Sequence, residues 1–178
     1  MKITSHGSKS KNFHESPMPE EVKTIVRDFH LLEFVECSLT MLNAFLLSAF
    51  VERWHPEISS FHLSFGEMTI TLYDIDQLFH ILVAGTLFTP VYINQVTTMC
   101  MVVDGLEVSE ADVLQEFGEI RGFHLQMSWL RKLYASLVEV CRFWAAARAY
   151  ILHLVTCTLF ADKYEIYIDI RYLCMFNT

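Results

Sequence analysis

Residues 51–76, with the sequence VERWHPEISSFHLSFGEMTITLYDID, hold the clearest local pattern in the chain. Residues 61–65 (FHLSF) and 68–72 (MTITL) each alternate apolar with polar side chains, which is the period of a half-buried strand. A Gly-Glu link at residues 66–67 joins the two runs. The pattern predicts a β-hairpin over about residues 61–72, and we expect the rest of the chain to be arranged around it.

Two helices are predicted before the hairpin. Residues 20–34 carry apolar side chains at helical spacing, and residues 37–52 carry a second stripe, which Pro56 ends. The side chains expected to face inward are Val22, Ile25, Val26, Phe29 and Leu32 in the first helix and Leu39, Leu42, Phe45, Leu46, Ala49 and Phe50 in the second. Residues 1–19 are polar, with three lysines and two prolines, and are predicted to form a disordered arm.

Three local signals predict helix starts after the hairpin. Thr71 stands three residues before Asp74, and Ser109 stands three residues before Asp112, which is the spacing of a capping box. Ser128 is expected to cap the helix that follows it. Each signal concerns side chains of one turn, so each predicts where a helix begins.

The remaining segments are assigned from their composition and period. The helix after Thr71 is expected to end at Gly85 and the helix after Ser109 near Gly118. Residues 89–103 are rich in Val, Thr and Met, so their propensity favours a strand. Residues 143–161 carry the longest helical pattern of the chain.

The predicted fold class is mainly α. We expect a single helical domain over residues 20–178, with one β-hairpin at about residues 61–72. Isoleucines at every second position from residue 166 to 170 predict a short C-terminal strand at about residues 165–171. The composition agrees with a sizeable core, because 53% of the residues are apolar and 19% are charged.

Charge and composition narrow the class of protein. The net charge of −8 argues against direct nucleic-acid binding, which needs a basic face. We predict neither a membrane-spanning helix nor a signal peptide, because the apolar runs are short or carry charges and the first residues are polar. The five cysteines are widely spaced, which predicts reduced thiols in an intracellular compartment, and most of them are expected to be small core residues because their sequence neighbours are apolar.

Candidate metal ligands gather at the start of the hairpin. His55 and His62 lie there with Glu52, Glu57 and Glu67 close in sequence. The spacing matches no H-E-x-x-H or comparable zinc motif, so solvated or hydrogen-bonded histidines and no metal site are predicted.

Three further residues have two interpretations each. Trp54 is either an anchor for a partner or a core residue that locks helix to hairpin, and its apolar neighbours favour the core. Arg53 is expected to form an ion pair with Glu57 or Glu67 that stabilises the turn. Arg148 lies in an apolar helix and is expected to need a carboxylate if it is buried, with a binding role as the alternative.

Two blocks of sequence resemble a known family. The first block comprises residues 52–57 (ERWHPE) and 61–72 with Asp74, and the second comprises residues 147–152 (ARAYIL) and 158–163 (TLFADK). Together they are similar to the plant mobile domain family, also called the aminotransferase-like plant mobile domain or MAIN-like family. The resemblance implies a signature of interaction or structural residues: Arg53, Trp54, His55, Phe61, Phe65, Trp144 and Arg148.

The resemblance also carries expectations about the whole protein. It implies a nuclear protein linked to meristem maintenance and to silencing of transposable elements, with silencing or phosphatase-like proteins as partners. Ala161 and Cys157 depart from the family pattern, which commonly has proline and a small residue at these positions. Family members carry further helices, so a C-terminally incomplete domain is expected.

Pyridoxal-phosphate chemistry, which the aminotransferase-like label suggests, is not supported. It needs a Schiff-base lysine and a phosphate cup, whereas three of the six lysines lie in residues 1–19 and no glycine-rich phosphate loop is present. G-x-S-x-G, P-loop and dinucleotide motifs are absent as well. No cofactor is therefore predicted.

Three functions follow from these observations, in order of preference. The first is a non-catalytic interaction module that uses an apolar patch near the hairpin and the Trp144 helix. The second is a partial product of a mobile-element-derived gene, without independent activity. The third is an enzyme, although no convergent acid–base or nucleophile set is visible in the sequence.

Overall fold

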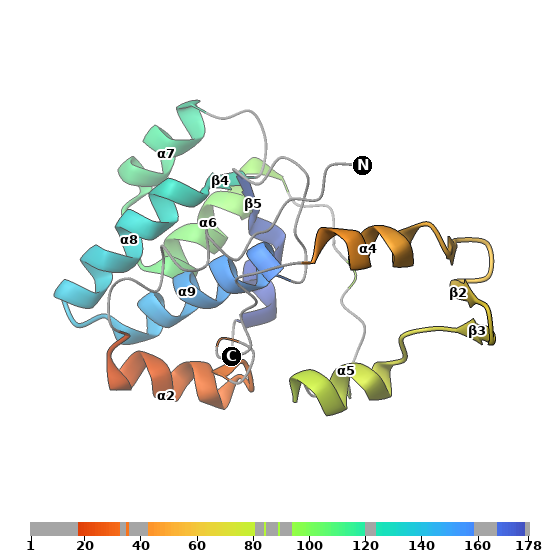
Figure 1. Ribbon diagram of the computed structural model, residues 1–178. Coiled ribbons are helices and arrows are strands. Elements are labelled where there is room, and N and C mark those ends of the chain that lie inside the picture. Colours follow the sequence, from red (N-terminus) through yellow and green to blue (C-terminus); the bar gives the residue numbers. More distant parts are fainter. Residues whose placement is uncertain are drawn as a thin grey trace.

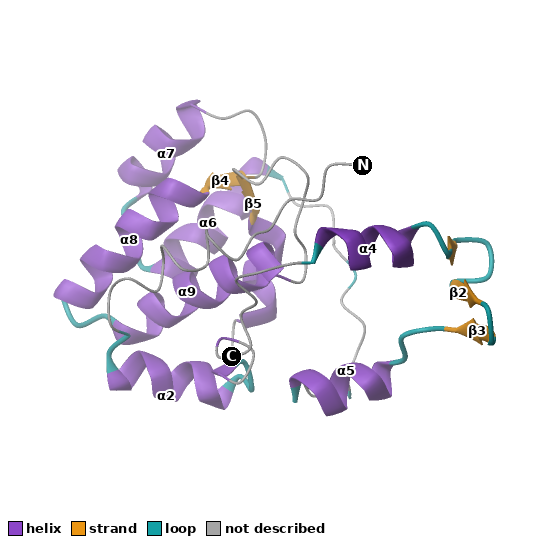
Figure 2. Ribbon diagram, viewed as in Figure 1, coloured by secondary structure: helices purple, strands orange, loops and turns teal. Residues whose placement is uncertain are grey.

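A computed structural model describes residues 18–32, 35, 43–80, 84, 89, 94–119, 124–158 and 167–176. Most of the predicted disordered arm (residues 1–17) lies outside these ranges, as do residues 36–42 and Gly85. Figures 1 and 2 show a body of helices on one side, formed by described residues of the ranges 18–35 and 94–176, and a smaller unit that projects from it on the other. The fold is mainly α with two small antiparallel sheets, as the sequence predicts.

Helix α9 (Phe143–Thr158) is the centre of the body. Residues 145–157 are buried except Arg148, so α9 is covered on all sides. Helix α8 (Met127–Glu139) and helix α2 (Glu20–Asp28) pack against it, and α6 (Gln95–Leu106) and the 3-10 helix η1 (Ile170–Phe176) also contact it. The alanines of α9 allow these close approaches because they have almost no side-chain bulk.

The first predicted helix is shorter than expected. Its apolar stripe is confirmed, because Val22, Ile25 and Val26 are buried against the core. It ends at Asp28 instead of residue 34, since His30 adopts a left-handed backbone conformation with φ 56°.

Helix α6 contradicts the strand predicted for residues 89–103. Asn94 caps it by accepting a hydrogen bond from the backbone nitrogen of Thr97 at 2.8 Å. Val102 and Leu106 are buried in the body, in the helix that packs on η1. The cap and the buried face outweigh the strand propensity of Val and Thr, which is weak and depends on context.

Helix α7 (Glu110–Glu119) begins as predicted, but α8 does not. The side chain of Ser109 accepts a hydrogen bond from the backbone nitrogen of Asp112 at 3.2 Å, in the predicted cap. Helix α8 starts at Met127 without a side-chain cap, so the predicted role of Ser128 is wrong. The buried carboxylate of Glu116 instead accepts a hydrogen bond from the backbone nitrogen of Gln126 at 2.9 Å.

A second small sheet ties two distant parts of the body together. Strand β5 (Tyr167–Asp169) confirms the predicted C-terminal strand and pairs antiparallel with β4 (His124–Gln126). Leu125 and Ile168 are directly opposite each other and fully buried. Beyond β5 the chain continues as η1.

Residues 43–80 form the projecting part, which we call the hairpin unit (Figure 1). Its elements in chain order are α4 (Ala44–Val51), β1 (Trp54–His55), β2 (Ser60–Leu63), β3 (Gly66–Met68) and α5 (Leu72–Phe79). Asn43 caps α4 by accepting a hydrogen bond from the backbone nitrogen of Leu46 at 3.1 Å. The part of the second predicted helix before Asn43 lies outside the described residues.

The predicted hairpin is present, with a different turn and one more strand. Leu63 pairs with Gly66, so Ser64 and Phe65 form the turn instead of Gly66 and Glu67. Gly66 follows the turn with φ 138°, a conformation that favours glycine. Strand β1, which the sequence analysis did not predict, pairs with the other edge of β2.

The predicted N-terminal cap of α5 is confirmed, whereas the predicted C-terminal end of the helix is wrong. The Thr71 side chain and the Asp74 backbone and side chain form the predicted capping box. The helix ends at Phe79, and His80 takes the left-handed cap conformation at φ 52° that was expected at Gly85.

The hairpin unit does not hold the core of the molecule. All of the buried apolar residues in the described part lie in the body, and Ser60 is the one buried residue among those of the range 43–80 whose side chains are described, which leaves out positions 44 and 79. Phe45, Leu46 and Phe50, predicted to face inward, are 42–90% exposed. The expectation that the chain is arranged around residues 51–76 is therefore wrong, because the body folds around α9.

Candidate interaction surface

The three-stranded sheet of the hairpin unit has one apolar and one polar face. Residues directly opposite each other on antiparallel strands point to the same face. Trp54 is opposite Phe61, and Phe61 is opposite Met68. One face therefore carries a row of three large apolar side chains, one from each strand.

Phe61 is the centre of an aromatic cluster on this face. Its ring centroid lies 4.8 Å from that of Trp54 and 5.5 Å from that of Phe50 on α4, both in edge-on arrangements. Phe61 thus contacts both Trp54 on β1 and Phe50 on α4, and these ring contacts hold the sheet against α4. Trp54 is 39% exposed, so it is not the core residue that its neighbours in sequence favoured.

The opposite face carries the histidines. The rings of His55 and His62 lie 5.9 Å apart, and Nδ1 of His62 is 4.0 Å from a carboxylate oxygen of Glu67. The guanidinium of Arg53 donates a hydrogen bond to the carbonyl of Ala49 at 2.9 Å, which satisfies the end of α4. Within the described residues no group of three or more His, Cys, Asp or Glu side chains is placed to hold a metal ion.

Large apolar side chains are exposed along the whole hairpin unit. Twelve of the eighteen exposed large apolar residues in the described part belong to it, with 39–90% of each side chain accessible. They are Phe45, Leu46, Phe50, Val51, Trp54, Ile58, Phe65, Met68, Ile70, Leu72, Tyr73 and Leu78. Together they expose on the order of 1,000 Å² of apolar surface, whereas the largest contiguous apolar patch of a typical monomer covers a few hundred Å².

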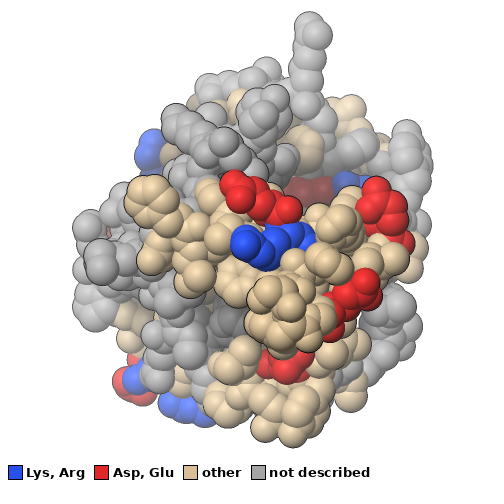
Figure 3. Space-filling model, turned by 45° about the vertical axis from the view of Figure 1, so that its right-hand side comes forward, with Lys and Arg blue, Asp and Glu red and all other residues tan. Residues whose placement is uncertain are grey.

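The charged residues of the hairpin unit are mostly acidic. Residues 43–80 contain five carboxylates and one arginine, a difference of −4 with histidines neutral. The carboxylates are Glu52, Glu57, Glu67, Asp74 and Asp76. Figure 3 turns this side of the molecule towards the reader and shows separate acidic groups around an uncharged surface, with a basic group between them.

Two of the predicted site residues lie on α9, away from the sheet in sequence and fold. Trp144 is half-exposed in the first turn of α9. Arg148 is half-buried, and its guanidinium donates a hydrogen bond to the carbonyl of Gly105 on α6 at 3.3 Å. The remaining signature residues, including Phe65 at the exposed hairpin turn, belong to the hairpin unit.

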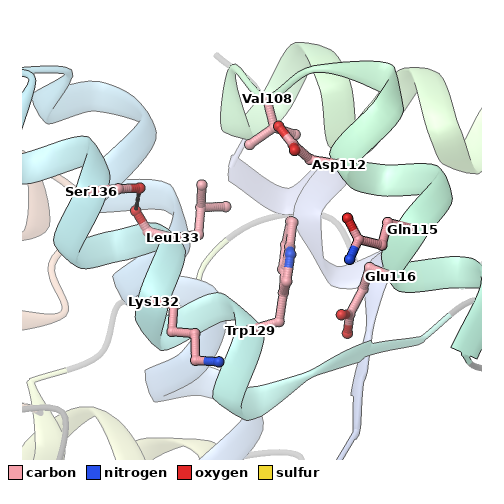
Figure 4. Close-up of a pocket in the computed structure, with 8 residues that line it drawn as sticks. All are labelled: Val108, Asp112, Gln115, Glu116, Trp129, Lys132, Leu133 and Ser136. Atoms are coloured by element: carbon pink, nitrogen blue, oxygen red, sulfur yellow. Dashed lines mark hydrogen bonds between the residues drawn. The ribbon is translucent and has the colours of Figure 1, made fainter.

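A pocket of about 420 Å³ lies between α7 and α8, where the sequence analysis gave no signal. In Figure 4 the indole of Trp129 stands between Lys132 and Leu133 on α8 and Gln115 and Glu116 on α7. The carboxylate of Glu116 accepts a hydrogen bond from the backbone nitrogen of Gln126. The acidic groups of the pocket thus stabilise helix starts, since Asp112 likewise belongs to the Ser109 cap.

A thiol and an imidazole meet inside α9. The sulfur of Cys157 lies 3.7 Å from Nε2 of His153, and both residues are almost fully buried. A substrate in solvent cannot reach this pair, so it contributes to packing. Cys100, Cys141 and Cys174 are exposed, contrary to the expectation that most cysteines are core residues.

Burial also perturbs two tyrosines of the body. The rings of Tyr134 on α8 and Tyr150 on α9 lie 5.9 Å apart. Burial raises the pKa of both hydroxyls above the ordinary value, and for Tyr150 the proximity of Tyr134 raises it further. Neither group can serve as a base near neutral pH.

None of the described helices has the length and apolarity needed to cross a membrane. No solved structure matches the chain.

Comparisons with known proteins give one consistent result. The protein MAIN-LIKE 1 of Arabidopsis thaliana is 31% identical over 144 residues, which cover 76% of this chain and 27% of that protein. MAINTENANCE OF MERISTEMS of the same plant is 29% identical over 148 residues, covering 76% of this chain and 28% of that protein.

A third relative, the serine/threonine-protein phosphatase 7 long form homolog of Arabidopsis thaliana, is 29% identical over 139 residues, or 76% of this chain and 10% of that protein. The chain therefore spans less than a third of the length of each of these relatives. The model of the plant mobile domain matches residues 30–178. The chain belongs to the plant mobile domain family.

Proposed function

We propose that this chain is a non-catalytic protein-interaction module whose contact surface is the hairpin unit. One observation carries the proposal: among the described side chains of residues 43–80, which leave out positions 44 and 79, no apolar one is buried and twelve large ones are exposed. Large exposed apolar surfaces are typical of sites that bind other proteins, membranes or ligands.

The chemistry of the surface supports binding in preference to catalysis. The aromatic cluster of Phe50, Trp54 and Phe61 supplies rigid side chains of the type that dominate binding energy. The carboxylates and histidines of the unit are spread over an exposed sheet face and two helices, and the pocket of about 420 Å³ lies elsewhere, between α7 and α8. Acid–base chemistry needs groups that converge on one reacting atom.

The biological setting is part of the proposal. One relative is named for the maintenance of meristems and another is a phosphatase homolog. We propose that this chain is a nuclear protein that acts in meristem maintenance and in silencing of transposable elements. Silencing or phosphatase-like proteins are its expected partners.

Capture of partners from nuclear extract tests the proposal. Phe65→Ser and Leu72→Ser replace two exposed apolar side chains of the hairpin unit, and Leu114→Ser replaces an exposed one on α7 of the body. The first two variants are expected to lose specific partners that the wild type and Leu114→Ser retain. Equal capture by all four proteins would contradict the proposal.

The same exposed surface fits a second candidate, a mobile-element-derived product without independent activity. Such a chain is expected to aggregate and to bind hydrophobic dyes strongly. A monomer that melts cooperatively and binds little dye would exclude this candidate and favour the interaction module.

A further inference from the structure

We infer that the hairpin unit binds an amphipathic helix of a partner protein whose apolar face is flanked by lysine and arginine. This inference rests on the proposed function and adds the chemical class of the partner. It depends on three properties of the described residues: the charge of the unit, the width of its apolar row, and the shortness of its strands.

The charge of the unit selects a basic partner. Five carboxylates and one arginine accompany the apolar side chains of residues 43–80; Glu52 and Glu57 are exposed, whereas Glu67 lies with His62 on the opposite face of the sheet. Opposite charges across an interface guide association and fix its register, whereas like charges oppose it. A basic segment is therefore favoured over an acidic or neutral one.

The same charge disfavours the other occupants. A second copy would bring two acidic hairpin units together, each with a formal charge of −4. Nucleic acids and anionic lipid surfaces are repelled by such a surface because they present phosphates. A basic protein segment is the remaining class with the required complementarity.

The geometry of the sheet favours a helix over an added strand. The row of Trp54, Phe61 and Met68 crosses three strands, so it spans about 10 Å, which is close to the diameter of an α-helix. The edge strands β1 and β3 contain two and three residues. A strand added to so short an edge gains few backbone hydrogen bonds, so side-chain contacts must provide the affinity.

Three synthetic peptides test the inference. Each has eighteen residues and the same leucine face at helical spacing, and the polar face carries lysine, glutamine or glutamate. Fluorescence anisotropy with the full chain measures the affinity for each peptide at low and at high salt. We expect the lysine peptide to bind roughly tenfold or more tightly than the glutamate peptide, with a difference that shrinks as salt screens the charges.

Two double variants show whether the preference comes from the hairpin unit. E52Q/E57Q removes two exposed charges there, and D104N/E110Q removes two exposed charges from the body. The first is expected to lose much of the preference for lysine, and the second is expected to keep it. Equal effects of the two double variants would overturn the assignment of the charge to this surface.

The remaining outcomes separate this inference from the proposed function. If all three peptides bind equally while partner capture still depends on Leu72, the basic partner is wrong and the interaction module stands. If no peptide binds and capture still depends on Leu72, the helical partner is wrong. If the chain instead self-associates through Phe65 and Leu72, as a concentration-dependent mass shows, the occupant is a second copy. If capture is also unaffected by Phe65→Ser and Leu72→Ser, both proposals fail.

Discussion

A Cβ atom placed on Gly105 would lie 2.8 Å from Cδ2 of Leu173, so α6 packs this closely on η1 only because residue 105 has no side chain. Leu173 is fully buried and has little room to move. Gly105→Val is expected to lower the free energy of unfolding by about 2 kcal/mol, the usual cost of overpacking. Chemical denaturation measures the change.

Two controls isolate the contact between Gly105 and Leu173. Asp104→Val introduces the same side chain at an exposed position of the same helix and is expected to be close to neutral, because Val and Asp have similar helix propensities. In a Leu173→Ala background the cost of Gly105→Val should fall, because the crowded atoms are gone. An unchanged cost in that background would show that the strain lies elsewhere.

The location of the core is tested by a pair of truncations. Ile151 on α9 is fully buried, whereas Leu78 on α5 is 68% exposed. Ile151→Ala is expected to cost about 2–5 kcal/mol and Leu78→Ala less than about 0.5 kcal/mol of global stability. Comparable losses in thermal or urea unfolding would mean that the hairpin unit belongs to the core after all.

Glu116 replaces the missing side-chain cap of α8. Glu116→Ala leaves the backbone nitrogen of Gln126 without this acceptor and is expected to cost about 1–3 kcal/mol. Glu116→Gln keeps an acceptor oxygen and should cost less. Gln115→Ala, at an exposed neighbouring position of the same pocket, is the matched control and should be close to neutral in urea unfolding.

The capping box of α5 makes a prediction about pH. The hydrogen bond from the Thr71 hydroxyl and that from its backbone nitrogen lower the pKa of Asp74 below the ordinary value of 3.8. Because the pKa of this carboxyl is lower in the folded than in the unfolded chain, the ionised carboxylate stabilises the helix at any pH above the unfolded-state pKa. This stabilisation is lost as the pH falls through the folded-state pKa. In Thr71→Val the pKa of Asp74, followed by NMR titration, is expected to rise towards 3.8. A Thr69→Val control at the exposed position before the cap should leave it unchanged.

Features that depend on one helical turn or on a long pattern could be predicted from the sequence. The Thr71–Asp74 and Ser109–Asp112 caps need only side chains three residues apart. The long apolar run of α9 gave its helix over residues 143–158. The turn of the hairpin was misplaced by two residues because the period of the strands does not show how far a strand continues before it reverses.

Features that depend on distant partners could not be predicted. The strand β4 has three residues, too few for a period, and exists because β5 pairs with it. The apolar stripe on α4 predicted that Phe45 and Phe50 face inward, but both are exposed. A stripe shows that one side of a helix is apolar and does not show whether another element covers that side. The sequence analysis expected an apolar patch near the hairpin and the Trp144 helix, whereas the extension of the candidate surface to α5 follows only from the exposure of Leu72 and its neighbours.

The buried core around α9 and the exposed apolar side chains of the hairpin unit are separate in sequence, which affects how this protein's sequence can change during evolution. Because the described side chains that stabilise the body lie outside residues 43–80, selection for thermodynamic stability and selection for molecular recognition act on separate positions. Under the proposed function, substitutions of Phe65 or Leu72 change the contact surface without a compensating change near Ile151. A scaffold of this kind can acquire new binding specificities one residue at a time.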